Sequence, residues 1–279
     1  MEHTLVMAGE GLSYCGAANE LARRSRSRSL PQNVEPSVGA QTMTEPPSLR
    51  VGAAFPDPPF EFTTDAGPDG FDIALLQSIA ARLGRSWQLV PYTGRDFNGI
   101  FAGLESGLYD CVASGATITP DREQMADFCA PYAISGQSLV LDQSRHPHVH
   151  STNDLNGLTI GVQRGNTSQP VAERLVAQGH AARVRIYAYN QIETALDDLS
   201  TGGCDAFMKL APVTHWFTRN RPALSVVQTG ITRERLGICV RTGNAALLQA
   251  INEAQIALTK DGTLPALIAK WLGNAAEPA

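Results

Sequence analysis

The nine residues Ser114-Gly-Ala-Thr-Ile-Thr-Pro-Asp-Arg122 carry the most informative chemistry of this sequence. They predict the end of a strand, a tight turn and the first turn of a helix, because Thr119 suits an N-cap and Pro120 suits the first helical position. Arg122 is unusual there, since a cation in the first turn faces the positive end of the helix dipole. An arginine beside free backbone N–H groups is typical of a site that an anion enters. The alternative is that an acidic neighbour neutralises Arg122 on a solvated surface.

Composition sets the broad class. The 279 residues are 43% hydrophobic and 18% charged with a net charge of −5, which is ordinary for a globular protein of one or two domains. A net negative charge does not favour binding to nucleic acid, which is itself negatively charged. No apolar stretch approaches the ~20 residues that span a bilayer. The histidines show no metal-ligand spacing, so neither a metal nor a cofactor is expected.

Five cysteines are scattered without a C-x-x-C motif, and their number is odd. Four of them lie in or beside apolar runs, which favours buried free thiols over disulfides or a metal site. The cysteines are Cys15, Cys111, Cys129, Cys204 and Cys239.

Residues 1–48 differ from the rest of the chain. The run Arg23–Ser29 and several prolines, with little apolar content, predict a disordered leader. A secretory signal needs a basic start and an apolar core, and neither is recognisable here. One interpretation is that translation begins at Met43.

From Leu49 onward, apolar strand-like runs alternate with segments that have apolar residues at helical spacing. This alternation predicts an α/β architecture with mainly parallel sheets. The expected strands are 49–54, 87–91, 111–114, 158–162, 184–189, 205–210, 224–227 and 235–240, and the expected helices are 71–83, 97–106, 171–177, 192–199, 213–218, 245–258 and 264–272.

The two halves of this pattern are similar to one another. Leu104–Ala113 and Leu199–Met208 both run from a helix end through glycine and aspartate into an apolar strand. We therefore expect two lobes of similar build. Ligands of open α/β sheets lie beyond the carboxyl ends of the strands, so two facing lobes would enclose a ligand in a cleft.

An ordered series of motifs resembles the extracellular solute-binding proteins of family 3, which serve polar-amino-acid ABC transporters. The resemblance covers about Leu49 to Asn274. The motifs include Pro58-Pro-Phe-Glu-Phe62, Gly70-Phe-Asp72, Phe97-Asn-Gly-Ile100, Leu104-x-x-Gly-x-x-Asp110, Thr117-Ile-Thr-Pro-Asp-Arg122, Asp127-Phe-Cys-Ala-Pro-Tyr132, Gly161-Val-Gln-Arg-Gly165, Gly237-Ile-Cys-Val240 and Lys270-Trp-Leu-Gly273.

The resemblance implies a two-lobed periplasmic-binding-protein type II fold with two hinge strands. The first lobe would be residues 49–136 plus 233–274, and the second 137–232. It implies a monomer that closes over a small carboxylate ligand and delivers it to an ABC transporter permease. It also implies a periplasmic or extracytoplasmic location, and the missing signal keeps the cytoplasm as the alternative.

The resemblance also implies site residues. Arg122 matches the arginine that grips the ligand carboxylate, a strong and directional pair. Gly115 and Thr117 match positions that offer backbone and hydroxyl hydrogen bonds to the ligand. Asn166 and Thr167 match positions that complete the carboxylate site. Phe97 matches an aromatic residue that packs on the ligand, and Phe60 and Phe71 are expected in the core.

Leu210, Ala54 and Asp57 depart from the family pattern, and Ala54 lacks the polar side chain often found near the ligand. Leu210 stands where amino-acid-binding members usually have an aspartate for the ligand ammonium, and leucine cannot replace it. Lys209 either faces solvent or meets a second anionic group. Asp57 stands where an aromatic is frequent; it either replaces the missing carboxylate or caps a proline-rich turn, and we favour the turn. The ligand is therefore expected to carry a carboxylate without having to be an ordinary α-amino acid.

Two other functions are compatible with this fold. Cyclohexadienyl dehydratases share it and need a general acid, for which Glu61, Asp57 and Glu234 are candidates that no motif places. A cytosolic sensor domain would explain the missing signal. We predict a binding protein rather than an enzyme.

Overall fold

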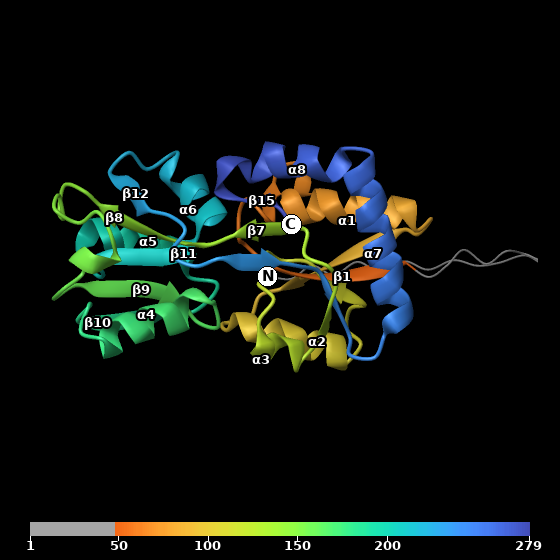
Figure 1. Cartoon of the computed structure of the whole chain (residues 1–279), viewed down its shortest axis with the longest axis horizontal. Coiled ribbons are helices and arrows are strands. Elements are labelled where there is room, and N and C mark those ends of the chain that lie inside the picture. The colour runs from red at the N-terminus through yellow and green to blue at the C-terminus, as the bar shows by residue number, and fades with distance from the viewer. Residues whose placement is uncertain (1–47) are drawn as a thin grey trace, which may run out of the picture. The chain divides into compact units, whose positions relative to one another are not determined.

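The computed structural model describes residues 48–279 (Figure 1). The expectations of a disordered leader and of a start at Met43 concern residues that lie outside this part of the chain. None of the described helices combines the length and the apolar character needed to cross a membrane.

The first lobe is built on a five-stranded sheet in the order β4-β1-β5-β14-β6. β4 and β5 pair parallel to β1, whereas β14 pairs antiparallel to β5 and β6. The strands are β1 (Leu49–Ala54), β4 (Trp87–Tyr92), β5 (Cys111–Val112), β6 (Asp127–Phe128) and β14 (Cys239–Val240). The accompanying helices are α1 (Phe71–Arg82), η1 (Phe97–Ile100), α2 (Phe101–Glu105), α3 (Pro120–Glu123), α7 (Ala245–Lys260) and α8 (Thr263–Trp271).

The second lobe is built on a five-stranded sheet in the order β10-β9-β11-β8-β12. β9 pairs parallel to β10 and β11, and β8 pairs antiparallel to β11 and β12. The strands are β8 (Gln137–Asp142), β9 (Thr159–Gln163), β10 (Arg183–Tyr187), β11 (Ala206–Leu210) and β12 (Leu224–Gln228). The helices are η2 (Thr152–Asp154), α4 (Ser168–Ala177), α5 (Ile192–Thr201) and α6 (Ala211–Thr218).

Both sheets are mixed, so the expectation of mainly parallel sheets is wrong. The antiparallel pairs arise where the chain passes between the lobes. The strand predicted over residues 235–240 is in fact two strands, because β13 (Glu234–Leu236) pairs with β7 (Ala133–Ser135) before β14 joins the first sheet. The rest of the alternation matches the predicted α/β class.

The hinge consists of the two crossings that join the lobes, and Figure 1 shows β7 between the two halves. β7 pairs with β13 on one side and with β15 (Glu277–Pro278) on the other. The crossings lie close together at Gly136, where a Cβ atom would overlap the backbone carbonyl oxygen of Thr232. Glycine at this position therefore lets the two hinge segments pass side by side.

The cores have the predicted character. Phe60 and Phe71 are fully buried in the first lobe, where their rings meet edge to face at 6.3 Å. The four described cysteines are buried free thiols, as expected, and Cys15 lies outside the described residues. Other short elements are the hairpin β2 (Phe62–Thr64) and β3 (Gly67–Asp69), and η3 (Gly273–Ala275).

Candidate functional site

All nine residues named from the sequence line one cavity where the two lobes meet. Its volume is about 20 Å³, which is room for about one water molecule. Gln137, Ser114 and Ser168 also line it and were missed by the sequence reasoning. The nine are Asp57, Phe97, Gly115, Thr117, Arg122, Asn166, Thr167, Lys209 and Leu210.

Arg122 lines this cavity from α3. Thr119 caps α3 by accepting a hydrogen bond from the Arg122 backbone N–H, as the sequence predicts. The side chain is only 4% exposed, so neutralisation on a solvated surface is wrong. Its guanidinium donates to the carbonyl oxygens of Thr117 and Gly165, both at 3.0 Å, and lies 4.6 Å from the centre of the Phe97 ring.

The electrostatics of Arg122 are those of a buried cation. Burial lowers the pKa of its guanidinium to about 10, although the nearby Glu234 acts in the opposite direction. Arg122 therefore stays charged at neutral pH. Within residues 48–279, no acidic side chain forms an ion pair with it.

Backbone contacts hold the lobes together beside Arg122. The Phe97 N–H donates to the carbonyl oxygen of Arg164 at 3.1 Å, and the Tyr189 N–H donates to that of Arg95 at 2.9 Å. Gly165 has a φ of +77° in this turn, and a Cβ atom there would overlap the Asp96 side chain. Glycine is needed here for both reasons.

Lys209 and Asp57 form an ion pair across the cleft, with Lys209 Nζ 2.8 Å from Asp57 Oδ1. Lys209 is 2% exposed and lies 5.1 Å from the centre of the Tyr189 ring, so it does not face solvent. Burial raises the pKa of the Asp57 carboxyl, and the Lys209 ammonium partly offsets this. The preference for Asp57 as a turn cap is wrong, because its carboxylate is committed to Lys209. Leu210 lines the cavity next to this pair and contributes no polar side-chain atom.

The Glu234 carboxylate accepts hydrogen bonds from two threonine hydroxyl groups that were expected to contact a ligand. Thr117 and Thr167 donate to its Oε2 at 2.6 and 2.7 Å. Thr232 and the Gln137 side-chain amide donate to its Oε1 at 2.6 and 2.9 Å. Glu234 begins β13 in the hinge, so its carboxylate joins the lobes and both crossings. The sequence offered Glu234 only as an unplaced acid, because its neighbours come from distant segments.

Two more buried carboxyl groups lie behind the cavity. Asp72 accepts the Gly115 N–H at 2.6 Å, so this N–H is engaged within the protein rather than free for a ligand. Burial raises the pKa of Asp72 to about 7. Glu61 accepts the Ser114 hydroxyl, and burial together with Asp72 raises its pKa well above the usual range. Of the three acids named for a dehydratase, only Asp57 lines the cavity.

Comparison with known proteins identifies the family. The model of "Bacterial extracellular solute-binding proteins, family 3" matches residues 49–274. This chain belongs to that family. The match spans every element that forms the cavity.

Individual relatives of this family-3 protein agree with the assignment. The L-cystine-binding protein TcyJ of Escherichia coli (strain K12) is 32% identical over 229 residues, covering 81% of this chain and 83% of the relative. The ABC transporter arginine-binding protein 1 of the same strain is 29% identical, covering 80% and 90%. Among solved structures, an ancestral arginine-binding protein bound to arginine has a TM-score of 0.75 at 33% identity, covering 82% of this chain and 100% of that one.

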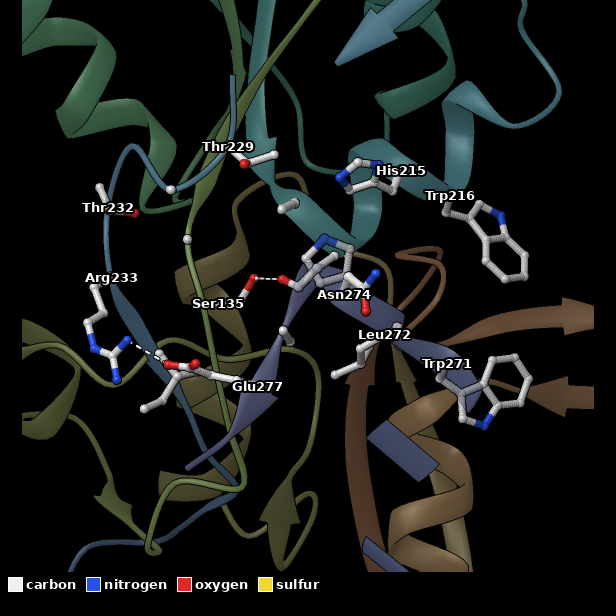
Figure 2. A pocket seen from close by; sticks show the side chains of 18 of the residues that line it. Ser135, His215, Trp216, Thr229, Thr232, Arg233, Trp271, Leu272, Asn274 and Glu277 are labelled. Carbon is white, nitrogen blue, oxygen red and sulfur yellow. Dashed lines mark hydrogen bonds and ion pairs between the residues drawn. The ribbon is translucent and has the colours of Figure 1, made fainter. Parts of the chain in front are cut away.

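This family-3 protein also has a larger groove, of about 820 Å³, that none of the nine predicted residues lines (Figure 2). It lies along β7, α6, residues 229–233 and the C-terminal segment. Ser135 donates to the carbonyl oxygen of Ala275, and Arg233 pairs with Glu277 at 2.6 Å; all four residues line the groove. Size alone would favour this groove, but the buried unpaired guanidinium lies in the smaller cavity.

Proposed function

We propose that this protein is the solute-binding component of an ABC importer and captures a small carboxylate-bearing solute between its two lobes. Relatives named as cystine-binding and as ABC transporter arginine-binding proteins support this proposal. The observation that carries it is Arg122, a buried guanidinium at the junction of the lobes without an acidic partner among the described residues.

Arg122 has donors left for a ligand. Three of the five guanidinium N–H groups donate to Asn98, Thr117 and Gly165, which leaves one N–H on each Nη atom. Two N–H groups on one planar cation match the two oxygens of a carboxylate. Because the cavity holds about one water, a ligand enters only when the lobes separate, and closure then follows from its preference for the closed state.

The other side chains that line the cavity limit the chemical class of the ligand. Lys209 and Asp57 neutralise one another, and Leu210 cannot bind an ammonium. The carboxylate is therefore the group that the site requires. A preference for amino acids over other small organic acids must come from another part of the wall, because the position that usually supplies it is apolar.

The proposal is tested by a thermal-shift screen of L-amino acids and small organic acids. Ligand at 100 times its Kd adds about 2.7 kcal/mol, which corresponds to a rise in Tm of roughly 5–10 °C for a protein of this size. We expect the rise in the wild type and in Arg164→Gln, an exposed arginine beside the cleft, and its loss in Arg122→Gln. An unchanged rise in Arg122→Gln would exclude Arg122 from the site.

We further propose that the protein works outside the cytoplasm with an ABC permease, as the family description and the relatives' names suggest. Determining the mature N-terminus of the protein from its native cell tests this. Recovery of an unprocessed chain in the cytoplasmic fraction would contradict it.

A further inference from the structure

The hydrogen bonds to Glu234 determine which side chains of the cavity wall can only accept a hydrogen bond from a ligand. An ionised carboxylate offers about four lone-pair sites, and four donors converge on Glu234. A threonine hydroxyl has a single proton. Thr117 and Thr167 give theirs to Glu234 and therefore present only lone pairs to any other partner.

Gln137 is oriented by the same carboxylate. Since a carboxylate oxygen only accepts, the atom of Gln137 that lies 2.9 Å from Glu234 Oε1 must be Nε2. The same Nε2 donates to Thr167 at 3.1 Å, so both amide protons are used. The amide oxygen Oε1 is left buried without a hydrogen-bond partner among the described residues, in a side chain that is 1% exposed and lines the cavity.

A buried acceptor without a donor is unfavourable unless a partner arrives, and an α-ammonium group supplies up to three donors. We propose that Gln137 Oε1, together with the Thr117 hydroxyl oxygen, receives the ammonium group of an L-α-amino acid, replacing the carboxylate that Leu210 lacks. This rests on the proposed function, in which Arg122 holds the carboxylate of the same ligand. In this arrangement Gln137 contacts the ammonium group of the ligand directly.

Glu234 is a positioning residue in this arrangement. It does not line the cavity, but it orients the Gln137 amide and turns both threonine protons away from the ligand. Its negative charge lies directly behind these acceptors. Asp57 does not serve this role, because Lys209 already occupies it at 2.8 Å. The substrate class is therefore a zwitterion rather than a simple organic acid.

The test compares amino acids with their deaminated counterparts by isothermal titration calorimetry at pH 7.5. The pairs are L-arginine with 5-guanidinopentanoic acid, L-lysine with 6-aminohexanoic acid, and L-glutamine with glutaramic acid. A site built around a ligand donor discriminates strongly against an analogue without it, so we expect at least one pair to show a preference of about tenfold or more for the amino acid.

Variants then test whether Gln137 and Glu234 cause the preference for the amino acid over its deaminated analogue. Gln137→Met keeps the length of the side chain without the amide. Glu234→Gln replaces one acceptor oxygen by an NH2 donor, so either the threonine hydroxyls or the Gln137 amide must change orientation. Each variant should reduce the preference at least about fivefold. Glu105→Gln, an exposed glutamate on α2, should leave the ratio unchanged. If one of the two variants does not fold, the other still decides.

Three results would overturn the inference: equal binding of the paired compounds by the wild type, no binding of any of the three amino acids, or equal weakening of both members of a pair in the variants. The proposed function fails separately. In these titrations it is contradicted if carboxylates of both kinds fail to bind or if Arg122→Gln binds them normally.

Discussion

Replacing Lys209 by methionine tests the buried ion pair that joins the lobes. Methionine keeps most of the apolar stem but leaves Asp57 buried without a counter-charge. Removing one partner of such a pair is destabilising by about 3–5 kcal/mol, because the remaining charge is uncompensated. Lys260→Met, at an exposed position, is the matched control and should change stability by less than about 0.5 kcal/mol.

The assay is urea unfolding of four proteins: the wild type, Lys209→Met, Asp57→Leu and the double variant. Replacing both partners by apolar groups removes both buried charges, so the double variant should lose far less stability than the sum of the single losses. Additive losses, or a Lys209→Met protein as stable as Lys260→Met, would refute the claim that this pair is buried and coupled.

The stability loss in Lys209→Met should depend on pH, and its direction follows from the pKa of Asp57. Burial already raises the pKa of Asp57 in the folded protein, and Lys209 opposes that rise. Without Lys209 the folded-state pKa rises further, so the native state binds a proton that the unfolded state releases. The stability deficit of Lys209→Met should therefore be largest at neutral pH and shrink as the pH falls toward 4.

Two further predictions concern other buried features. The pKa of Asp72, raised to about 7 by burial, means that wild-type stability falls as pH rises from about 4 to 7, and Asp72→Asn should flatten this dependence in urea titrations at pH 5 and 8; an unchanged slope would contradict it. Gly136→Ala should lower Tm through a loss of roughly 1–3 kcal/mol, because its Cβ overlaps the Thr232 carbonyl. A calorimetric Tm equal to that of the wild type would show that the hinge segments separate freely.

Local signals in the sequence were sufficient for much of the first lobe and for Arg122. The N-cap and proline of α3 are adjacent residues, so their geometry is set within one turn. The nine site residues lie at strand ends, at the starts of helices or in the loops that follow β1 and β5, where an α/β fold brings them together. The mixed sheets were not predictable in this way, because strand direction depends on how the chain returns through the hinge.

The site contacts that the sequence did not predict were missed for one common reason. β8 was not among the expected strands, and Gln137 at its start was missed because its partners Thr167 and Glu234 lie 30 and 97 residues away. Glu234 acquires its role from Thr117, Thr167 and Gln137, which lie 117, 67 and 97 residues away. The Lys209–Asp57 pair spans the two lobes. Contacts between distant segments carry no local sequence signature.

A crystal structure with the carboxylate solute that gives the largest thermal shift would show whether Arg122 binds the carboxylate of the solute. We expect both carboxylate oxygens within about 2.7–3.2 Å of the Arg122 Nη atoms, between closed lobes. A ligand bound in the groove of Figure 2, or a carboxylate held elsewhere in the cleft while Arg122 contacts protein atoms alone, would contradict it.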